Sequence, residues 1–335
     1  MSSIVLARPS DVVPSGLLPI GRRVRLPERA AVALPGRVAP LAPARRPGLP
    51  RLLRLCLVEA RPAVQVIFLL RFLVGAALGG PAALAGHAAQ VAAGAASWFC
   101  LTLAIYLLNG ACDVLEDQYN GSRRPIASGA LPVYLAIPIA VAAGGLGLAL
   151  AMLVPGMLPL AGGLLLLGLA YSAGPVPLKR WPLACAPVVI GAGVLSYAAG
   201  DIAADGAVNP RLVVFAAAMS AWMAVGSLAK DLSDVDGDRL AGRRTCPVVL
   251  GEGPARLVTS AAALAVAGAF QVAVRAFCPL LLAVSEMTLL GAGVLTVLAL
   301  TRLSRGARVQ QRRPYRAFAF CQFAAHLTCL WSTVL

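Results

Sequence analysis

The stretch AQVAAGAASWFCLTLAIYLLNGACDVLED, residues 89–117, joins a long apolar run to a cluster of acids. The apolar part, residues 89–111, contains no charged residue and is long enough for a helix to cross the hydrocarbon layer of a membrane. Asp113, Glu116 and Asp117 follow directly after it. The stretch therefore predicts a membrane-spanning helix that ends in a group of carboxylates.

Similar apolar segments recur along the rest of the chain. Of its 335 residues, 59% are hydrophobic and 13% are charged, whereas an ordinary soluble domain has about a quarter charged residues. This composition excludes a soluble globular protein. We expect an all-α, polytopic membrane protein, a nine-helix transmembrane bundle of two four-helix halves followed by a last helix. The nine segments are residues 62–82, 89–111, 131–152, 154–172, 183–203, 210–230, 254–275, 279–301 and 315–335.

Residues 1–56 differ from this pattern. They are rich in Pro and Arg and lack hydrophobic periodicity, so we expect a disordered basic arm ahead of a transmembrane domain over residues 57–335. This arm and the loops after the second, fourth, sixth and eighth segments hold nearly all the Lys and Arg. By the positive-inside rule, the N-terminus and these loops are predicted to be cytoplasmic and the C-terminus to lie outside.

The net charge of +15 indicates an anionic partner. We expect no nucleic acid, because the basic residues lie in short segments between long apolar runs and not on one folded face. An anionic membrane surface, an anionic substrate, or both, fit better. The eight cysteines include no C-x-x-C pair, so the sequence predicts neither a zinc site nor a disulfide framework.

The acidic residues are concentrated in two short segments on the predicted cytoplasmic side. In the first, Asn109, Asp113 and Asp117 follow one another at intervals of four, so a continued helix would place them on one face. The same spacing recurs in the second segment, at Lys230, Asp234 and Asp238, with Asp231 ahead of them. Each segment then continues into a glycine and a pair of arginines, which indicates a degenerate internal repeat.

Two such segments facing one cavity form a site of hard oxygen ligands. Carboxylates of this kind suit Mg²⁺, which keeps several waters and bridges carboxylates to substrate phosphates. The neighbouring Lys and Arg side chains suit the remaining phosphate oxygens. The sequence thus predicts a diphosphate clamp beside an apolar bundle, and hence a substrate with a lipid tail. Solvated loop charges are the alternative, but they do not explain the spacing.

At these residues the chain resembles the UbiA superfamily of intramembrane prenyltransferases. NGACDVLEDQYNGSRRPIASGALP (residues 109–132) matches that family's N-x-x-x-D-x-x-x-D followed by R-P-I-x-S-G. KDLSDVDGDRLAGRRTCPVVLG (residues 230–251) matches its D-x-x-D-x-x-x-D motif, and YSAGPVPLKR (residues 171–180) matches its Y-S-x-x-P-x-x-x-K-R loop. The resemblance extends over about residues 58–335.

The resemblance implies Mg²⁺ as the cofactor, placed between the two Asp motifs and the diphosphate of an isoprenoid donor. The metal ligands that it implies are Asn109, Asp113, Asp117, Asp231, Asp234 and Asp238. The residues that it places near the diphosphate are Asn109, Arg124, Tyr171, Lys179, Arg180, Lys230 and Asp231. Those expected to be essential for catalysis are Asp113, Asp117, Asp234 and Asp238.

The resemblance implies a transferase that moves an isoprenyl group from a prenyl diphosphate to a small aromatic acceptor. The alternative is a terpene cyclase on the same scaffold, in which a double bond of the same isoprenoid captures the carbocation and no acceptor is needed. A transporter is a third class, with Glu286 and His326 as its buried polar candidates. The acids gather at one face instead of the midplane, which argues against it. Donor chain length and acceptor identity stay open.

Overall fold

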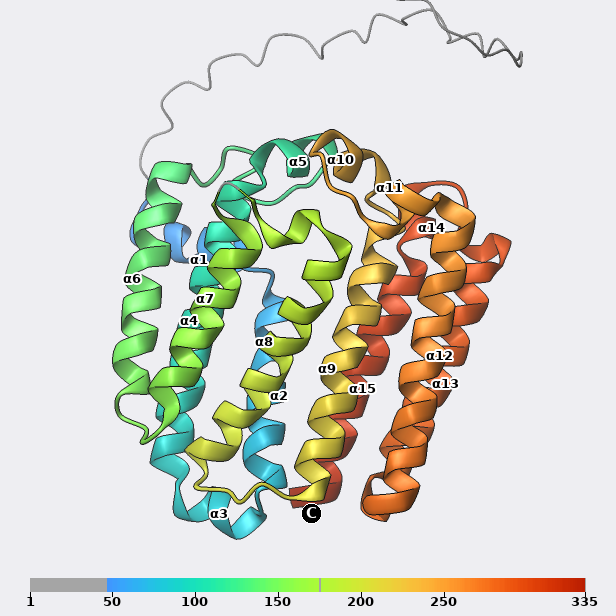
Figure 1. Cartoon of the computed structure of the whole chain (residues 1–335). Helices are drawn as coiled ribbons and strands as arrows, with labels where there is room; N and C mark the ends of the chain where they lie inside the picture. Colours follow the sequence, from blue (N-terminus) through green and yellow to red (C-terminus); the bar gives the residue numbers. More distant parts are fainter. Residues whose placement is uncertain (1–46, 175, 335) are drawn as a thin grey trace, which may run out of the picture. The chain divides into compact units, whose positions relative to one another are not determined.

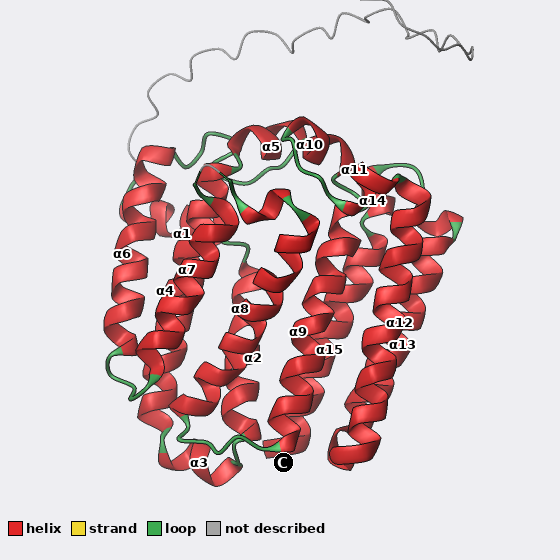
Figure 2. Cartoon of the chain, viewed as in Figure 1, coloured by secondary structure: helices red, strands yellow, loops and turns green. Residues whose placement is uncertain are grey.

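The computed structural model describes residues 47–174 and 176–334. Throughout this part of the chain the regular secondary structure is helical, with no strand (Figure 2). The prediction of an all-α protein is confirmed for these residues. Most of the predicted basic arm, residues 1–46, lies outside the described residues.

The long helices follow the predicted apolar segments closely. They are α2 (Pro62–Leu78), α4 (Ala88–Cys112), α6 (Val133–Ala151), α7 (Met157–Ser172), α8 (Pro182–Ala203), α9 (Pro210–Asp231), α12 (Glu252–Phe277), α13 (Leu282–Leu300) and α15 (Arg313–Val334). The shorter elements are α1 (Leu49–Glu59), α3 (Pro81–Gly86), α5 (Val114–Tyr119), α10 (Val235–Leu240), α11 (Cys246–Leu250), α14 (Arg308–Gln311) and the 3-10 turns η1 (Leu178–Arg180), η2 (Pro279–Leu281) and η3 (Arg302–Ser304).

Local sequence signals set several helix starts. Proline is the first residue of α2, α8 and α9, where its missing N–H removes no helical hydrogen bond and its fixed φ suits a helix. Asn209 also caps α9, because its side-chain oxygen accepts a hydrogen bond from the backbone N–H of Leu212 at 3.1 Å. Inside lipid, the helix then satisfies its own backbone polar groups.

Six helical segments are long and apolar enough to cross a membrane: α4, α6, α8, α9, α12, and α13 with its preceding turn η2. A seventh span results if α1 and α2 count as one segment broken by a bend of 71°. Helix α7 is apolar but has 16 residues, fewer than a typical span. The described residues thus contain six or seven candidate spans, and the count of nine stays a prediction.

Helix α1 occupies residues that the sequence assigns to the basic arm. The helix begins at Leu49, whereas the arm is expected to extend to residue 56. These residues form a helix because they have a short apolar face, which the arginines of this segment make difficult to see in the sequence. Leu55 and Cys56 follow Leu52 by three and four residues, and all three pack in one cluster with Leu107 of α4.

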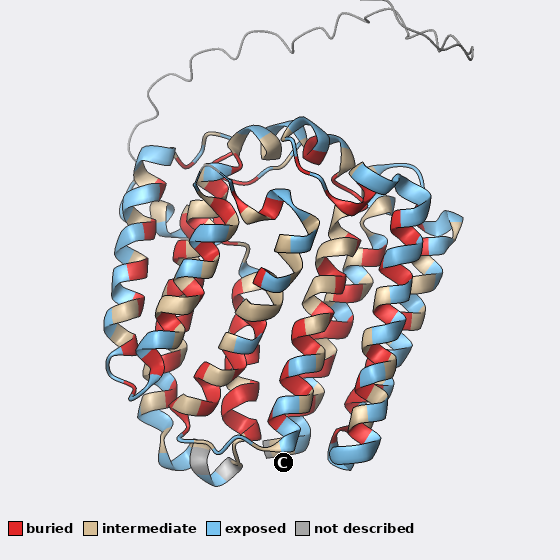
Figure 3. Ribbon diagram, viewed as in Figure 1, coloured by how far each residue is buried: buried red, intermediate tan, exposed pale blue. Residues whose placement is uncertain are grey.

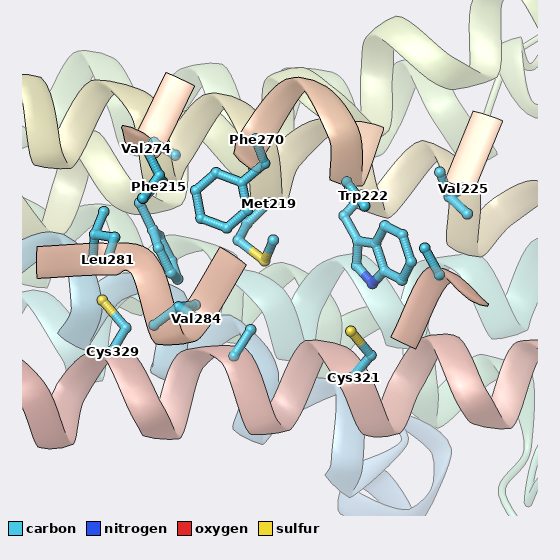
Figure 4. Close-up of a cluster of buried hydrophobic side chains, with 14 of the residues drawn as sticks. Phe215, Met219, Trp222, Val225, Phe270, Val274, Leu281, Val284, Cys321 and Cys329 are labelled. Carbon is cyan, nitrogen blue, oxygen red and sulfur yellow. The ribbon is translucent and has the colours of Figure 1, made fainter. Parts of the chain in front are cut away.

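The two largest apolar cores in the described part of the chain lie between the long helices. One contains Trp98 and lies among α2, α4, α7 and α8. The other contains Phe215 and Trp222, with Cys321 and Cys329, and lies among α9, α12, α13 and α15 (Figure 4). Helices α2 and α8 contribute to both cores and therefore join the two halves (Figure 1). Exposed residues follow the outward faces of the helices (Figure 3), as expected of a bundle surrounded by lipid.

Helices α2 and α8 approach each other closely where each carries a glycine. A Cβ atom on Gly200 would collide with the carbonyl oxygen of Phe72, and one on Gly75 would collide with that of Tyr197. Small residues permit such close backbone contact between helices in a membrane. The crossing fixes the spacing of the two helices that join the halves.

The two acid-rich segments lie together at one end of the bundle. Helices α5 and α10 lie side by side across this end, with α11 and α14 nearby (Figure 1). Gly237 of α10 packs directly against the side chain of Asn120, which follows α5. Helix α3 and the C-terminal end of α15 lie at the opposite end (Figure 1). The loops that the charge pattern assigns to one side are thus found together.

Candidate functional site

Asp113 and Asp234 each stand at a break in the helical path. Helix α4 ends at Cys112 and α5 begins at Val114, with Asp113 between them at φ −103° and ψ 15°. Asp234 precedes α10 with nearly the same angles, φ −115° and ψ 13°. The prediction of a continued helix is therefore wrong. Carboxylates four residues apart on a straight helix repel each other, and the break lets each one meet its own cation.

The backbone repeats itself around the two breaks. Each short helix has six residues and is followed by a glycine with left-handed φ, 62° in the first segment and 68° in the second. The backbone N–H of Ser122 donates to the carbonyl oxygen of Asp117 at 2.8 Å. The N–H of Arg243 donates in the same way to Asp238, also at 2.8 Å. The internal repeat that the sequence indicates is thus present in the local backbone.

The carboxylates of the first segment are paired with cations from other parts of the chain. Asp113 forms ion pairs with Lys179 and with Arg243, the latter at 3.6 Å. Asp117 forms an ion pair with Arg124 at 2.7 Å. Since Lys179 and Arg243 lie far from Asp113 in the sequence, the fold itself assembles this group.

The loop after α7 approaches the first segment from the side. The Asn109 amide donates to the hydroxyl of Ser172 at 3.1 Å. Lys179 is buried and reaches Asp113. Arg180 is exposed, and its carbonyl oxygen accepts the N–H of Arg244 at 2.9 Å. This loop therefore contributes Lys179 to the site, whereas Arg180 is exposed and does not line the cavity described below.

The second segment has a similar set of ion pairs. Asp234 pairs with Lys230 at 3.0 Å and with Arg308 at 2.6 Å. Burial opposes its ionisation, but Lys230 and Arg308 hold the pKa of Asp234 well below the usual value. Asp238 is fully buried, lies 3.6 Å from Arg243, and has two carboxylate oxygens without a hydrogen-bond partner among the described residues. Burial raises the pKa of Asp238.

Arg243 connects the two segments. Its guanidinium pairs with Glu116 at 3.1 Å, with Asp113 at 3.6 Å and with Asp238 at 3.6 Å. Burial raises the pKa of Glu116 to about 7, although Arg243 favours its ionised form. Carboxylates from both segments are therefore near enough to share one cation.

A cavity of about 510 Å³ begins at these carboxylates and continues between the helices. Its polar end is lined by both acid-rich segments and by the basic residues Arg61, Arg123, Lys230, Arg243, Arg308 and Arg312. The rest of its wall is mainly apolar and comes from α2, α4, α7, α8, α9 and α15, for example Phe68, Ile105, Leu164, Val188, Met223 and Phe318. A cavity of this kind fits a ligand with an anionic head and an apolar tail.

The cavity brings together six residues that the sequence predicts for the site. These are Asn109, Asp113, Asp117, Tyr171, Lys230 and Asp234. Five others do not line it: Arg124, Lys179, Arg180, Asp231 and Asp238. Lys179 and Asp238 belong to the site indirectly, through their ion pairs with Asp113 and Arg243.

Arg124 faces buried carboxylates and does not line the cavity. Its guanidinium pairs with Glu59 and with Asp117, each at 2.7 Å, and donates to the carbonyl oxygen of Tyr106 at 3.3 Å. Glu59 is fully buried and also accepts the N–H of Ile126 at 2.8 Å. This arrangement favours a role for Arg124 in positioning Asp117 over direct contact with a diphosphate.

Several residues at the polar end come from outside the predicted motifs. Arg61 stands at the bend between α1 and α2 with a left-handed φ of 57°, and no sequence signal marks it. Arg308 begins α14, Arg312 directly follows that helix, and Tyr315 lies at the start of α15. The sequence shows the first two as loop cations, and their spacing of four residues is the signal that could have identified them.

The carboxylates fit a hard cation by their chemistry, although ion pairs currently occupy them. The part of the chain that the structure describes has no group of three or more His, Cys, Asp or Glu side chains arranged around a metal position. Asp113, Asp117 and Asp234 instead form ion pairs with Lys or Arg. All of these ligands are nevertheless oxygen donors, and neither oxygen of Asp238 has a hydrogen-bond partner among the described residues. A divalent cation would exchange places with the basic side chains.

The model of the UbiA prenyltransferase family matches residues 68–327. A comparison with curated proteins found no match. Among solved structures, a UbiA homolog from Archaeoglobus fulgidus bound to DMAPP and Mg²⁺ has a TM-score of 0.63 and 20% identity, covering 82% of this chain and 99% of that chain.

Two further structures are similar in fold. A UbiA homolog from Aeropyrum pernix K1 has a TM-score of 0.58 and 21% identity, over 78% of this chain and 96% of that chain. A digeranylgeranylglyceryl phosphate synthase has a TM-score of 0.58 and 14% identity, over 84% and 98%. These structural likenesses show the shared fold, and the family model matches well over half of the sequence. The chain is therefore an integral membrane protein that belongs to the UbiA prenyltransferase family.

Proposed function

We propose that this protein is a Mg²⁺-dependent prenyltransferase that moves an isoprenyl group from a prenyl diphosphate to a small aromatic acceptor. One observation carries the proposal: a single cavity joins a polar end, lined by both carboxylate segments and six basic residues, to a mainly apolar interior. A prenyl diphosphate has the same division into an anionic head and an apolar tail. The Archaeoglobus fulgidus relative is described with DMAPP and with GPP, each together with Mg²⁺.

The residues proposed to hold Mg²⁺ come from both segments. They are Asn109, Asp113, Asp117, Asp231, Asp234 and Asp238. When bound, Mg²⁺ would neutralise charge on the departing diphosphate. Lys179, Lys230 and Arg308, released from their present carboxylates, would then bind phosphate oxygens together with Arg61 and Arg243. Tyr171, which lines the cavity, completes the surroundings of the diphosphate in this proposal.

The apolar wall determines what happens to the isoprenyl group. Phe68, Ile105 and Met223 line its part of the cavity, where little water is available to quench a carbocation. An acceptor carbon or heteroatom captures the cation, and a nearby carboxylate takes the proton that is released. Glu116 is placed for this role, because it lines the cavity and burial raises its pKa to about 7.

The membrane arrangement of the protein forms part of the proposal. Nine spans place the N-terminus and the loops of the polar end in the cytoplasm and the C-terminus outside. The catalytic domain extends from the start of α1 at Leu49 to residue 335, and the basic residues ahead of it help to set the orientation. Labelling of single introduced cysteines with an impermeant reagent in sealed cells tests this orientation at each loop.

The decisive experiment is an assay with purified protein, Mg²⁺ and a prenyl diphosphate, with and without an aromatic acceptor. We expect diphosphate release and a prenylated aromatic product when the acceptor is present, detected in the organic extract. A cyclic hydrocarbon or terpene alcohol formed at catalytic rates without acceptor would instead identify a terpene cyclase. Full activity in the presence of a chelator would contradict the role of Mg²⁺.

A further inference from the structure

Helix α1 has an apolar side that the bundle does not cover. Leu49, Leu53 and Leu57 are 67%, 54% and 43% exposed, and their spacing of four residues places them along one face of the helix. The neighbouring face packs against the bundle through Leu52 and Cys56. An exposed apolar stripe of this kind is unfavourable in water, so we expect an apolar medium or another molecule to cover it.

The remaining side of α1 is basic. Arg51 and Arg54 are exposed and lie three residues apart, so they are neighbours on the helix surface, with the partly exposed Val58 between them. Neither arginine forms an ion pair within the described part of the chain. The one acid of the helix, Glu59, is fully buried. The surface of α1 thus combines an apolar stripe with two cations and no carboxylate.

The bend after α1 turns this helix toward the plane of the membrane. The bend between α1 and α2 is 71°, and α2 runs through the bundle packed against the candidate spans α4 and α8. Helix α1 lies toward the end of the bundle that carries α5 and α10 (Figure 1). Helices that cross a membrane tilt on average about 20° from its normal, so a helix bent this far from α2 lies close to the membrane plane.

We propose that α1 is a membrane-surface helix that binds the headgroups of anionic phospholipids through Arg51 and Arg54. An amphipathic helix in the interface buries its apolar face at the boundary of the acyl chains, which would cover the leucine stripe. Guanidinium groups bind phosphate oxygens well. No residue of α1 lines the cavity, so this surface is separate from the proposed active site.

The bilayer is the occupant that the rest of the molecule favours. The chain is an integral membrane protein, and α1 continues through its bend into the bundle, so the membrane surface always lies beside this helix. A second copy of the chain would bring the same cations to the contact, and like charges would oppose it. An anionic membrane surface complements both the arginines and the net charge of +15.

The end of α1 connects this surface to the first acid-rich segment. Glu59, its last residue, pairs with Arg124 at 2.7 Å, and Arg124 pairs with Asp117 at the same distance. Arg61, at the bend itself, lines the polar end of the cavity. Lipid that holds α1 in position therefore also holds Glu59 against Arg124. Anionic lipid should thus order the first acid-rich segment without entering the cavity.

The test is hydrogen–deuterium exchange of the full-length protein in two kinds of nanodisc. One contains phosphatidylcholine alone, and the other contains phosphatidylcholine and phosphatidylglycerol in equal parts. We expect phosphatidylglycerol to slow the exchange of α1 by about five-fold for each arginine at the surface. Arg51→Gln/Arg54→Gln should remove this difference between the lipids, whereas Arg51→Lys/Arg54→Lys should keep it because the charge remains. An equal lipid effect in the wild type and the Gln variant overturns the proposal, as does the absence of any effect in the wild type.

Arg302→Gln/Arg305→Gln is the matched control for the loss of charge. Arg302 and Arg305 are also exposed and three residues apart, but Arg302 begins the three-residue turn η3 and Arg305 follows it, which is too short for an amphipathic face. This variant should keep the slower exchange of α1 in phosphatidylglycerol. A loss as large as that in the α1 variant would show a general effect of net charge and overturn the assignment to Arg51 and Arg54.

Leu53→Gln tests the apolar stripe. Leu53 is exposed in the protein itself, so the change should matter only if lipid or another molecule covers the residue. We expect faster exchange of α1 in both kinds of nanodisc, each holding one copy of the protein. Unchanged exchange there, together with a dimer in detergent that Leu53→Gln dissociates in analytical ultracentrifugation, would assign the stripe to a second copy and overturn the proposal.

Glu59→Gln separates lipid binding from its effect on the site. In the wild type, phosphatidylglycerol should slow the exchange of α5 as well as that of α1. Glu59→Gln removes the ion pair with Arg124, so it should abolish the effect on α5 and retain the effect on α1. An effect on α5 that survives in Glu59→Gln overturns the connection through this residue. None of these measurements uses a substrate, so failure of prenyl transfer leaves their outcome unaffected.

Discussion

Neighbouring aspartates at the polar end differ in exposure, since Asp236 is exposed whereas Asp234 and Asp238 are buried. Asp113, Asp117, Asp234 and Asp238 each pair with a buried or half-buried cation. Replacing any of them by Asn keeps the shape and removes the charge that Mg²⁺ requires. We expect turnover to fall roughly a hundred-fold in each variant, measured by steady-state kinetics on purified protein.

Asp236→Asn is the matched control for this series. Asp236 lies on the same short helix as Asp238, but its side chain is 81% exposed and its ion pair with Arg239 is 3.8 Å long. Exposed pairs of this kind contribute little, so its turnover should stay within about two-fold of the wild type. Wild-type turnover in two of the four variants at Asp113, Asp117, Asp234 and Asp238 would contradict the assignment of the metal ligands.

Arg124 leads to a prediction about stability. The guanidinium lies between Glu59 and Asp117, so Arg124→Met leaves the carboxylate of Glu59 buried and unpaired. Breaking a buried pair on one side costs about 3–5 kcal/mol, and the unfolding temperature in detergent should fall accordingly. The double variant Glu59→Gln/Arg124→Met should be more stable than Arg124→Met alone. An unaltered unfolding temperature with a raised KM for the donor would instead support direct diphosphate binding.

At the scale of the elements, the crossing of α2 and α8 leads to a prediction about packing. Gly200→Ala places a methyl group against the carbonyl oxygen of Phe72 and forces the two helices apart. Overpacking of this kind costs about 1–3 kcal/mol, which calorimetry or a thermal-shift assay in detergent should detect. Gly162→Ala on α7 is the control, because a Cβ atom there meets nothing within 4 Å. Equal stability of the two variants would show that α2 and α8 can move apart without loss of stability.

The sequence predicts long elements better than short ones, for a physical reason. A helix within lipid needs about 20 apolar residues, and this requirement leaves a pattern that locates α4 and α9 to within a few residues. Helix α1 needs only a narrow apolar face of Leu52, Leu55 and Cys56, which its arginines obscure. The break at Asp113 depends on cations that arrive from distant loops, and local spacing does not contain that information.

At the scale of the whole molecule, the start of α1 defines how much of the chain is needed. Deleting residues 2–46 removes no residue of α1 and should leave turnover of the purified protein within about two-fold of the wild type. Deleting residues 2–60 also removes Cys56 and Glu59, which are buried against the first acid-rich segment and its loop. The longer deletion should lower both stability and activity. If the protein without residues 2–46 folds but is inactive, the deleted residues belong to the site.

The site as a whole is only partly predictable from the sequence. The spacing of aspartates identifies Asn109, Asp113, Asp117 and Asp234, because a repeated interval is visible in a linear chain. Arg61, Arg308 and Glu59 reach the same end of the bundle from separate helices. Their contribution depends on how the helices pack, and no local pattern records it.

The short helices α5 and α10 also matter for inhibitor design. They lie across one end of the bundle, outside the candidate spans, and hold several of the site carboxylates there (Figure 1). An inhibitor can thus combine an anionic group that binds the proposed Mg²⁺ at the polar end with an apolar chain that enters the cavity from the same end. Such a molecule competes with substrate for both halves of the cavity at once, and its potency should depend on the match between anchor length and cavity depth.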